Sequence, residues 1–322
     1  AHCAAPVCGP SRAAVLSGIA TVNSGVYSNN ANYTKRLKPY VSLPETFKTN
    51  GYHTLGYGKI FHGATPKNSF HEYASAFPKP WPKEALLNTH QTPTYDWKRK
   101  EQTISFPRNG LKADRTWTTN HTFDWGPLDI PKEEFHDYRG GEWMTQQLSK
   151  KHSTPLFLNF GFQLPHQPLY APKAFHDMYP IDRVVLPKYI SNDLNDLSQA
   201  GKDYALIPTT SGTHASVIRG DQWKQATSSY LATVSFVDHI IGNMIHALDQ
   251  SDYAKNTWIV LWSDHGWHLG EKQHWGKATG WYRATRVPFI IVPPKNNEPK
   301  GFVPGQVCKK PVNLLDLYPT LI

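Results

Sequence analysis

The chain has 322 residues and a mass of 36.5 kDa, with 34 Lys and Arg against 25 Asp and Glu, a net charge of +9. The length supports a sizeable core, 39% hydrophobic content excludes a disordered chain, and three Cys residues are too few for a disulfide framework or a four-thiolate zinc site. The positive charge indicates anionic partners, and because no nucleic-acid-binding signature appears we expect a sulfated or carboxylated glycan and no nucleic acid.

Apolar runs and helical patterns alternate along the chain, which predicts an α/β fold with a central, mostly parallel sheet flanked by helices. The predicted buried parallel strands are Thr54–Gly58, Leu156–Phe160, Trp258–Trp262 and Pro288–Val292. No run approaches the roughly 18 consecutive apolar residues of a membrane span. A ligand site is expected at the carboxyl ends of the strands.

The first helix is predicted to start at Pro10 and Ser11 and to end at Gly18. Cys8 would then lie just before a helix N-terminus, where free N–H groups favour an anion. Arg12, one turn into the helix, can add two parallel hydrogen bonds to an oxyanion. From spacing alone, a small buried Cys before a capped helix is an equally good interpretation.

A second helix is predicted over Leu43–Thr49, with Ser42 as its N-cap. The strand that follows ends in Gly58 and presents Lys59 and His62 from one loop, which suits an anionic ligand, although a solvated surface loop explains the same pattern.

Residues 63–135 break this rhythm and are interpreted as a long aromatic-rich insertion. Trp81, Trp97 and Trp125 within it could stack on sugar rings, with core or loop packing as the alternative.

The strand at 156–160 is followed by a loop that presents Gln163 and His166. A His of near-neutral pKa can serve as a general acid. The longest predicted helix covers residues 222–249. Its expected core stripe is Tyr230, Val234, Val237, Ile241, Met244 and Leu248.

The strand at 258–262 delivers Asp264 and His265 at its carboxyl end, and Asp264 is a hard oxygen ligand suited to Ca²⁺. A last helical turn is expected over Asn313–Leu317, and Pro319 would either limit that turn or start a new helix. Cys3 is expected to be a buried thiol.

Several of these segments together resemble the type I sulfatases. Cys8-Gly9-Pro10-Ser11-Arg12 with Leu16-Ser17-Gly18 resembles the signature in which the Cys is oxidised to formylglycine. Gly58-Lys59, Pro165-His166-Gln167-Pro168 and Ser263-Asp264-His265-Gly266 are similar to further segments of the family. His62 and His265 are particularly like the iduronate-2-sulfatase branch, whereas the likeness fades over 63–135 and about 185–220.

The resemblance implies an alkaline-phosphatase-like sulfatase fold and a role for each matching residue. The implied catalytic residues are Cys8, Arg12, Lys59, His62, His166 and Lys277. The implied metal ligands are Cys8, Asp264 and His265, binding Ca²⁺ or another divalent metal. Gln163, His268 and His274 are predicted substrate contacts. Gln163 replaces a His of iduronate-2-sulfatase, so the identity of the sugar does not carry over from that enzyme.

The family also takes an Asp-Asp pair of metal ligands from a strand before the Cys motif, and no acidic residue precedes Cys8 here. We therefore expect residues 1–322 to be one sulfatase catalytic domain that lacks its first strand and its C-terminal subdomain. The implied partners are a sulfated oligo- or polysaccharide and a formylglycine-generating maturation enzyme, in a secreted or periplasmic setting. The alternatives are a phosphate or phosphonate monoester hydrolase of the same fold, or a silent protein that binds sulfated glycan.

Overall fold

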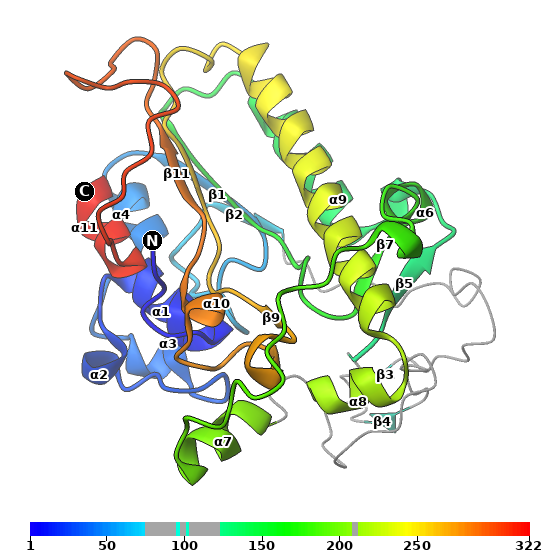
Figure 1. The fold of residues 1–322 in the computed structure, drawn as a ribbon. Helices are drawn as coiled ribbons and strands as arrows, with labels where there is room; N and C mark the ends of the chain where they lie inside the picture. Colours follow the sequence, from blue (N-terminus) through cyan, green and yellow to red (C-terminus); the bar gives the residue numbers. More distant parts are fainter. Residues whose placement is uncertain (75–94, 97–100, 103–122, 208–211) are drawn as a thin grey trace.

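The computed structural model describes residues 1–74, 95–96, 101–102, 123–207 and 212–322 (Figure 1). The helices are α1 (Cys8–Ser17), α2 (Thr21–Ser24), α3 (Tyr33–Arg36), α4 (Leu43–Thr49), α5 (His136–Leu148), α6 (Lys173–His176), α7 (Gln199–Leu206), α8 (His214–Arg219), α9 (Trp223–Asp249), α10 (Tyr282–Thr285) and α11 (Leu317–Leu321). The strands are β1 (His53–Gly58), β2 (Glu72–Ala74), β3 (Tyr95–Asp96), β4 (Glu101–Gln102), β5 (Trp125–Leu128), β6 (Leu156–Gly161), β7 (Leu169–Pro172), β8 (Ile259–Trp262), β9 (His268–Leu269), β10 (Trp275–Gly276) and β11 (Phe289–Val292). Short 3₁₀ turns cover Lys132–Glu134, Ile181–Arg183, Glu271–Gln273 and Leu314–Asp316.

A parallel sheet of order β2-β1-β6 positions the site. β1 pairs with β6 from His53↔Leu156 to Gly58↔Gly161, so the two strands end at the same edge. Helices α4 and α5 both pack against these two strands. The predicted strands at 54–58 and 156–160 are therefore confirmed, as is an α/β fold with parallel strands flanked by helices.

The predicted strands at 258–262 and 288–292 exist, but the prediction that they are buried and parallel is wrong. β8 and β11 pair antiparallel, with Phe289 opposite Trp262 and Val292 opposite Ile259. Ile290 is 54% exposed, and residues along β11 alternate between half-buried and exposed. This alternation is typical of an antiparallel pair with one solvated face. A four-residue apolar run has the same composition in either strand direction, which is why the sequence did not decide it.

The long helix α9 was predicted correctly in extent, and its core-facing side was predicted wrongly in part. Val234 is 41% exposed. The buried face is instead built from small and large residues at spacings of three and four. Its members include Ala226, Ser229, Ala232, Thr233, Phe236 and Ile240. Of the predicted stripe, Leu248 is buried and Tyr230 and Met244 pack against core clusters, so the prediction is wrong at Val234.

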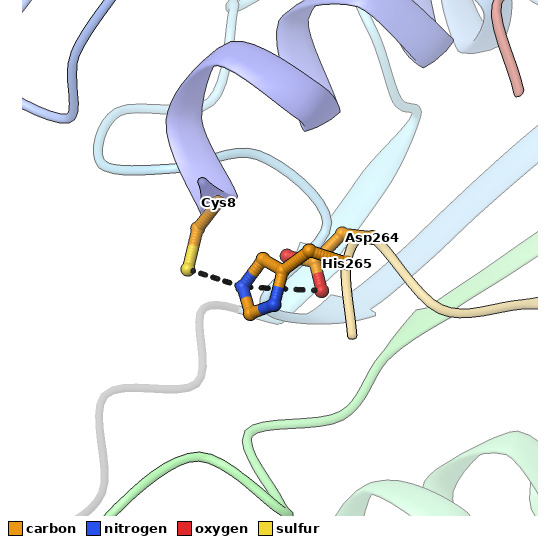
Figure 2. Close-up of side chains that lie close together, drawn as sticks. All are labelled: Cys8, Asp264 and His265. Atoms are coloured by element: carbon orange, nitrogen blue, oxygen red, sulfur yellow. Dashed lines mark hydrogen bonds and ion pairs between the residues drawn. The ribbon is translucent and has the colours of Figure 1, made fainter. Parts of the chain in front are cut away.

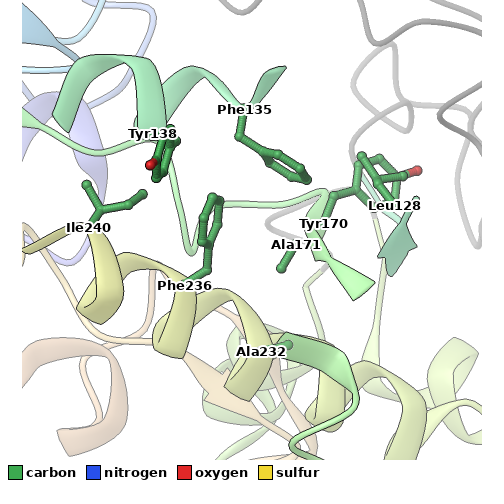
Figure 3. Packing of buried hydrophobic residues seen from close by; sticks show 8 residues of the cluster. All are labelled: Leu128, Phe135, Tyr138, Tyr170, Ala171, Ala232, Phe236 and Ile240. Carbon is green, nitrogen blue, oxygen red and sulfur yellow. The ribbon is translucent and has the colours of Figure 1, made fainter. Parts of the chain in front are cut away.

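The main core cluster lies where α9 meets α5, β5 and β7 (Figure 3). Phe236 of α9 contacts Phe135 in an edge-to-face pair with ring centroids 5.0 Å apart, and Tyr138 stacks beside it at 6.5 Å. Among the described helices, α9 is the one that is long and apolar enough to cross a membrane by length and composition. Because its inner face is packed in this cluster, we interpret it as a core helix.

The described ends of the aromatic-rich insertion predicted at 63–135 take part in sheets of the fold. Residues 72–74 form β2 inside the central sheet, parallel to β1. Trp125 is buried in β5, packs 6.0 Å from Trp275, and donates from its indole nitrogen to Gln222 at 3.2 Å. Core packing, not sugar stacking, is therefore the role of Trp125. Trp81 and Trp97 lie outside the described residues.

The start of α4 and the turn before α11 agree with the predictions made from the local sequence. Ser42 accepts a hydrogen bond from the Glu45 N–H and caps α4, whose extent matches the prediction. The predicted turn at 313–317 is the 3₁₀ turn Leu314–Asp316, and a new helix, α11, contains Pro319 in its first turn. Cys3 is buried, as expected.

Candidate active site

The site lies at the carboxyl edge of the central sheet, where the loops after β1 and β6 touch. The Lys59 N–H donates to the Gly161 carbonyl at 2.7 Å. A Cβ at Gly58 would collide with the Gly161 carbonyl oxygen, and one at Gly161 would collide with that of Lys59. Gly58 also has a φ of 82°, a left-handed value that favours glycine. These two glycines therefore let the loops that carry Lys59 and His166 leave the sheet side by side.

Helix α1 brings Cys8 to the same edge. Cys8 is its first residue, one position inside the helix rather than just before it as predicted, and is 1% exposed. Its N-cap, Val7, has no side-chain acceptor. Instead, Asn29 in the loop after α2 accepts the Gly9 N–H at 2.8 Å. The capping of this helix end is thus tertiary, a feature that no local signal in the sequence could have shown.

Arg12 fastens α1 to two other loops. Its Nε donates to Asp264 Oδ2 at 2.7 Å, and its Nη1 donates to the carbonyls of Lys59 and Ile60. Ser11 also donates to the Asp264 carbonyl. Arg12 was predicted to hold an oxyanion, and in this structure its guanidinium is committed to Asp264 and to the loop after β1. Its role here is to join Cys8, Asp264 and Lys59 into one unit.

Cys8, Asp264 and His265 lie together, as the resemblance implied (Figure 2). Cys8 Sγ is 3.2 Å from His265 Nε2, which is 3.7 Å from Asp264 Oδ1. Among the described residues this is the group whose donor atoms all lie within 4.8 Å of one another. His265 Nδ1 donates to the Gly266 carbonyl at 2.8 Å, so Nε2 keeps its lone pair for a ligand.

This donor set fits part of a divalent metal site. It offers a carboxylate oxygen, an imidazole nitrogen and the Cys8 side chain, whereas Ca²⁺ takes six to eight oxygen ligands. Burial would raise the pKa of Asp264, but Arg12, with smaller effects from His265 and the site lysines, holds it far below its usual value. Asp264 is therefore ionised, as a metal ligand must be.

Two lysines face the Cys8 sulfur. Lys277 Nζ lies 2.8 Å from Sγ and is 4% exposed, and it also lies 5.8 Å from the ring centroid of Trp267. Burial alone would raise the pKa of Cys8, but Lys277 and then Lys59 outweigh it and hold that pKa well below its ordinary value. Burial also lowers the pKa of Lys59. The position of the Cys8 side chain thus strongly stabilises a negative charge.

The loop after β6 is held by a residue that the sequence analysis missed. Asp137, buried at the start of α5, accepts the Gln163 N–H at 2.9 Å and the Leu164 N–H at 2.8 Å. Burial raises the pKa of Asp137 to about 6, although the two N–H groups oppose this. An acidic residue in the first turn of a helix is common, so nothing in the sequence singles it out.

Burial and the site lysines lower the pKa of both histidines that the resemblance implied to be catalytic. His166 Nδ1 donates to the Gln167 carbonyl at 2.6 Å, which leaves Nε2 as an acceptor. Burial first, and then Lys59 and Lys277, hold the pKa of His166 well below its usual value. Burial lowers the pKa of His62 to about 4, with Lys59 adding to the effect, and its Nδ1 has no hydrogen-bond partner among the described residues.

The three predicted substrate contacts lie in different surroundings. Gln163 lies in the loop beside His166 and is half-buried. His268 and His274 are each 1% exposed, and both nitrogens of each ring are engaged within the protein. Their placement does not fit the predicted contact with substrate. Proximity to the Asp264-His265 motif in sequence was a poor guide because the chain turns inward after His265.

Comparison with known proteins matches the Sulfatase family over residues 1–322. The chain belongs to the sulfatase family. It is 36% identical to a sulfatase of Formosa agariphila over 333 residues, and 30% identical to human iduronate 2-sulfatase over 331 residues. These alignments cover 100% and 98% of this chain but only 60% and 54% of the relatives, so the chain spans little more than half their length.

Solved structures share the fold of this sulfatase-family chain. A phosphonate monoester hydrolase from Silicibacter pomeroyi superposes with a TM-score of 0.69 at 20% identity, covering 99% of this chain and 64% of that one. A 2-O GAG sulfatase superposes with a TM-score of 0.63 at 20% identity, covering 100% and 60%. The predicted alkaline-phosphatase-like sulfatase fold is confirmed.

Proposed function

We propose that this protein hydrolyses sulfate esters of a sulfated glycan, with a formylglycine made from Cys8 as the nucleophile. The observation that carries the proposal is the placement of Cys8, buried at a helix N-terminus with its sulfur 2.8 Å from the Lys277 ammonium. An anion bound there meets helix N–H groups and two lysines, with the Cys8 side chain in line to react. Membership of the sulfatase family supports the same reaction.

Formylglycine suits sulfate because its hydrate has two hydroxyl groups. In the proposal, a maturation enzyme supplies the oxidant, so that the Cys8 side chain becomes an aldehyde and its sulfur leaves as sulfide, and water then adds to the aldehyde to give the hydrate. One hydroxyl attacks the substrate and the second later expels the product. A plain thiol would form a covalent ester with no such route to release.

The first step transfers the sulfuryl group to the hydrate. The site lowers the pKa of the thiol at position 8, and the same lysines would favour the hydrate as its anion. Its oxygen bonds to sulfur while the bond from sulfur to the sugar oxygen breaks. The sugar oxygen takes a proton from Nε2 of His166. Because the bound sulfate offsets the charges of Lys59 and Lys277, substrate binding raises the pKa of His166 and allows it to carry that proton.

The second step releases sulfate. The remaining hydroxyl of the adduct gives its proton to His62, the carbon–oxygen bond to the sulfate breaks, and the aldehyde forms again. His62 is uncharged before this step because burial lowers its pKa, so it is ready to accept a proton. Arg12 contributes by keeping Asp264 and the Lys59 loop in register with α1.

A divalent metal, Ca²⁺ in the first instance, would be held by Asp264, His265 and the side chain at position 8. When bound it supplies Lewis-acid polarisation of the oxygens that it contacts. The proposal that the substrate is a glycan is supported by the similarity to a 2-O GAG sulfatase. We assign Gln163, which lies in the loop beside the proposed acid His166, to contact with the sugar.

The test uses the whole protein made in its native host. The mass of the tryptic peptide that contains Cys8 and ends at Arg12 should show the aldehyde in place of the thiol. Matched sulfate, phosphate and phosphonate esters should be hydrolysed with sulfate preferred, and Cys8→Ala should abolish turnover. A faster reaction with phosphate or phosphonate esters, or binding of sulfated glycan without turnover by the matured protein, would refute the proposal.

A further inference from the structure

His274 connects the Lys277 loop to a segment far away in the sequence. Its Nε2 lies 2.9 Å from the Lys277 carbonyl oxygen and its Nδ1 lies 2.6 Å from the Ala205 carbonyl oxygen, at the end of α7. The ring is 1% exposed. The buried His274 ring therefore contacts the backbone of Lys277, while the Lys277 ammonium contacts the Cys8 sulfur.

Both partners of the ring are acceptors, and this constrains its protonation. A carbonyl oxygen needs an N–H, and a neutral imidazole has only one. The neighbouring His268 shows the contrast. Its Nδ1 donates to the Glu271 carbonyl at 3.0 Å and its Nε2 accepts from the Thr279 hydroxyl at 2.9 Å, which a neutral ring satisfies fully. Only the doubly protonated ring satisfies both contacts of His274.

The backbone around Lys277 needs such support. Ala278 has a φ of 69°, a left-handed value that is unfavourable for a residue with a Cβ. Its N–H donates to the Pro6 carbonyl at 2.9 Å, just before α1, and its carbonyl accepts from the Tyr204 hydroxyl of α7. The end of α7 thus holds both Lys277 and Ala278.

On the basis of the proposed function, we infer that His274 is a positioning residue for Lys277, and that it acts as a two-donor imidazolium. In this form it joins the end of α7 to the main chain of Lys277 and fixes the ammonium against the nucleophile. Loss of one ring proton removes one of the two bonds and leaves a buried nitrogen lone pair facing a carbonyl oxygen.

The inference predicts a dependence on pH. In the described part of the chain the titratable groups near the ring include His268 of β9, at 5.1 Å between centroids, and His214 of α8, whereas Lys277 meets the ring through its backbone carbonyl. Burial lowers the pKa of His274, and the two carbonyls act in the opposite direction. Lys277 is therefore held best below that pKa, and less well as the pH rises through it.

The first experiment compares His274→Gln with His268→Gln as a matched control. Both remove an equally buried ring from neighbouring positions, and only the first touches the Lys277 backbone. We expect His274→Gln to lower kcat on a sulfate ester about tenfold or more and to lose the limb of the pH profile that the wild type shows as His274 titrates. His268→Gln should keep that limb. The same profile in both variants, or an unchanged kcat in His274→Gln, would overturn the inference.

The second experiment needs neither turnover nor a variant that folds. Nitrogen NMR of the protein labelled in its histidines reports which ring nitrogens carry hydrogen. We expect both nitrogens of His274 to be protonated on the acid side of its titration and one proton to leave as the pH rises through it. One nitrogen without hydrogen over the whole range would refute the inference even in an active sulfatase. A doubly protonated ring in a protein without sulfatase activity would instead support the imidazolium and reject the proposed function.

Discussion

Replacing Asp137 by Asn separates catalysis from folding in this protein. The carboxylate is buried and accepts N–H bonds from Gln163 and Leu164, and these residues lead into the turn that carries His166. The His166 N–H in turn donates to the Gln163 carbonyl at 3.0 Å. An Asn side chain has one acceptor oxygen, and its NH₂ group would face the other N–H. The loop must therefore shift.

The expected change in stability is small because two effects oppose each other. A carboxyl whose pKa is about 6 rather than 3.8 costs the folded state about 3 kcal/mol at neutral pH, since burial disfavours its charge. Asn removes that cost. The lost hydrogen bond to a charged acceptor is worth about 1.5–3 kcal/mol. The free energy of unfolding at pH 7 should therefore change by no more than about 1.5 kcal/mol.

Activity should respond much more. A displacement of about 1 Å in the loop of the proposed general acid should lower kcat about 10- to 100-fold. Urea denaturation and steady-state kinetics on a sulfate ester measure the two effects. Because the native pKa of Asp137 is raised, wild-type stability should gain from this group as the pH falls from about 7 towards 4, and Asp137→Asn should lose that gain. Asp177→Asn, in an exposed pair with Lys173, is the control. Full activity in Asp137→Asn, or a loss of stability above about 3 kcal/mol, would refute this account.

Four further changes have defined outcomes. Lys277→Met should lower kcat/KM about 10²- to 10³-fold, and in protein that keeps the thiol it should raise the pKa of Cys8 as measured by alkylation rate against pH; an unchanged thiol pKa would contradict the charge pairing. Phe236→Ala should lower the free energy of unfolding by about 3–5 kcal/mol in denaturant titrations, and a loss below about 1 kcal/mol would mean that the α9 cluster is not packed as described. Ser42→Ala should cost about 1 kcal/mol by removing the cap of α4, seen as a lower Tm, whereas Ser42→Gly should cost only a few tenths of that. Treatment with a calcium chelator should abolish sulfatase activity and readdition of Ca²⁺ should restore it, and full activity of the chelated, metal-free protein would reject the proposed ligand set.

Much of the site followed from local sequence because its residues stand at strand ends and at a helix start. Gly58 and Gly161 mark where β1 and β6 stop; Lys59 follows Gly58 directly, and His166 lies in the loop that follows Gly161. Parallel strands end at one edge of a sheet, so side chains that follow them meet without any further information. The cap of α4 was predictable for the same reason, since Ser42 and Glu45 are three residues apart.

What depended on contacts between distant segments could not be predicted in this way. A short apolar run such as 289–292 does not state its partner's direction, and the inner face of α9 depends on the residues of α5, β5 and β7 that pack against it.

By itself, then, the sequence indicated which side chains gather at the candidate site and which strands and caps precede them, because those features are governed by near neighbours. Only the tertiary structure showed that Asp137 accepts hydrogen bonds from the loop before His166, and that His274 is buried with both ring nitrogens engaged within the protein. The physical reason is that burial and hydrogen-bond partners arise from segments brought together by folding, such as the end of α7 and the Lys277 loop, which lie about 70 residues apart in the chain.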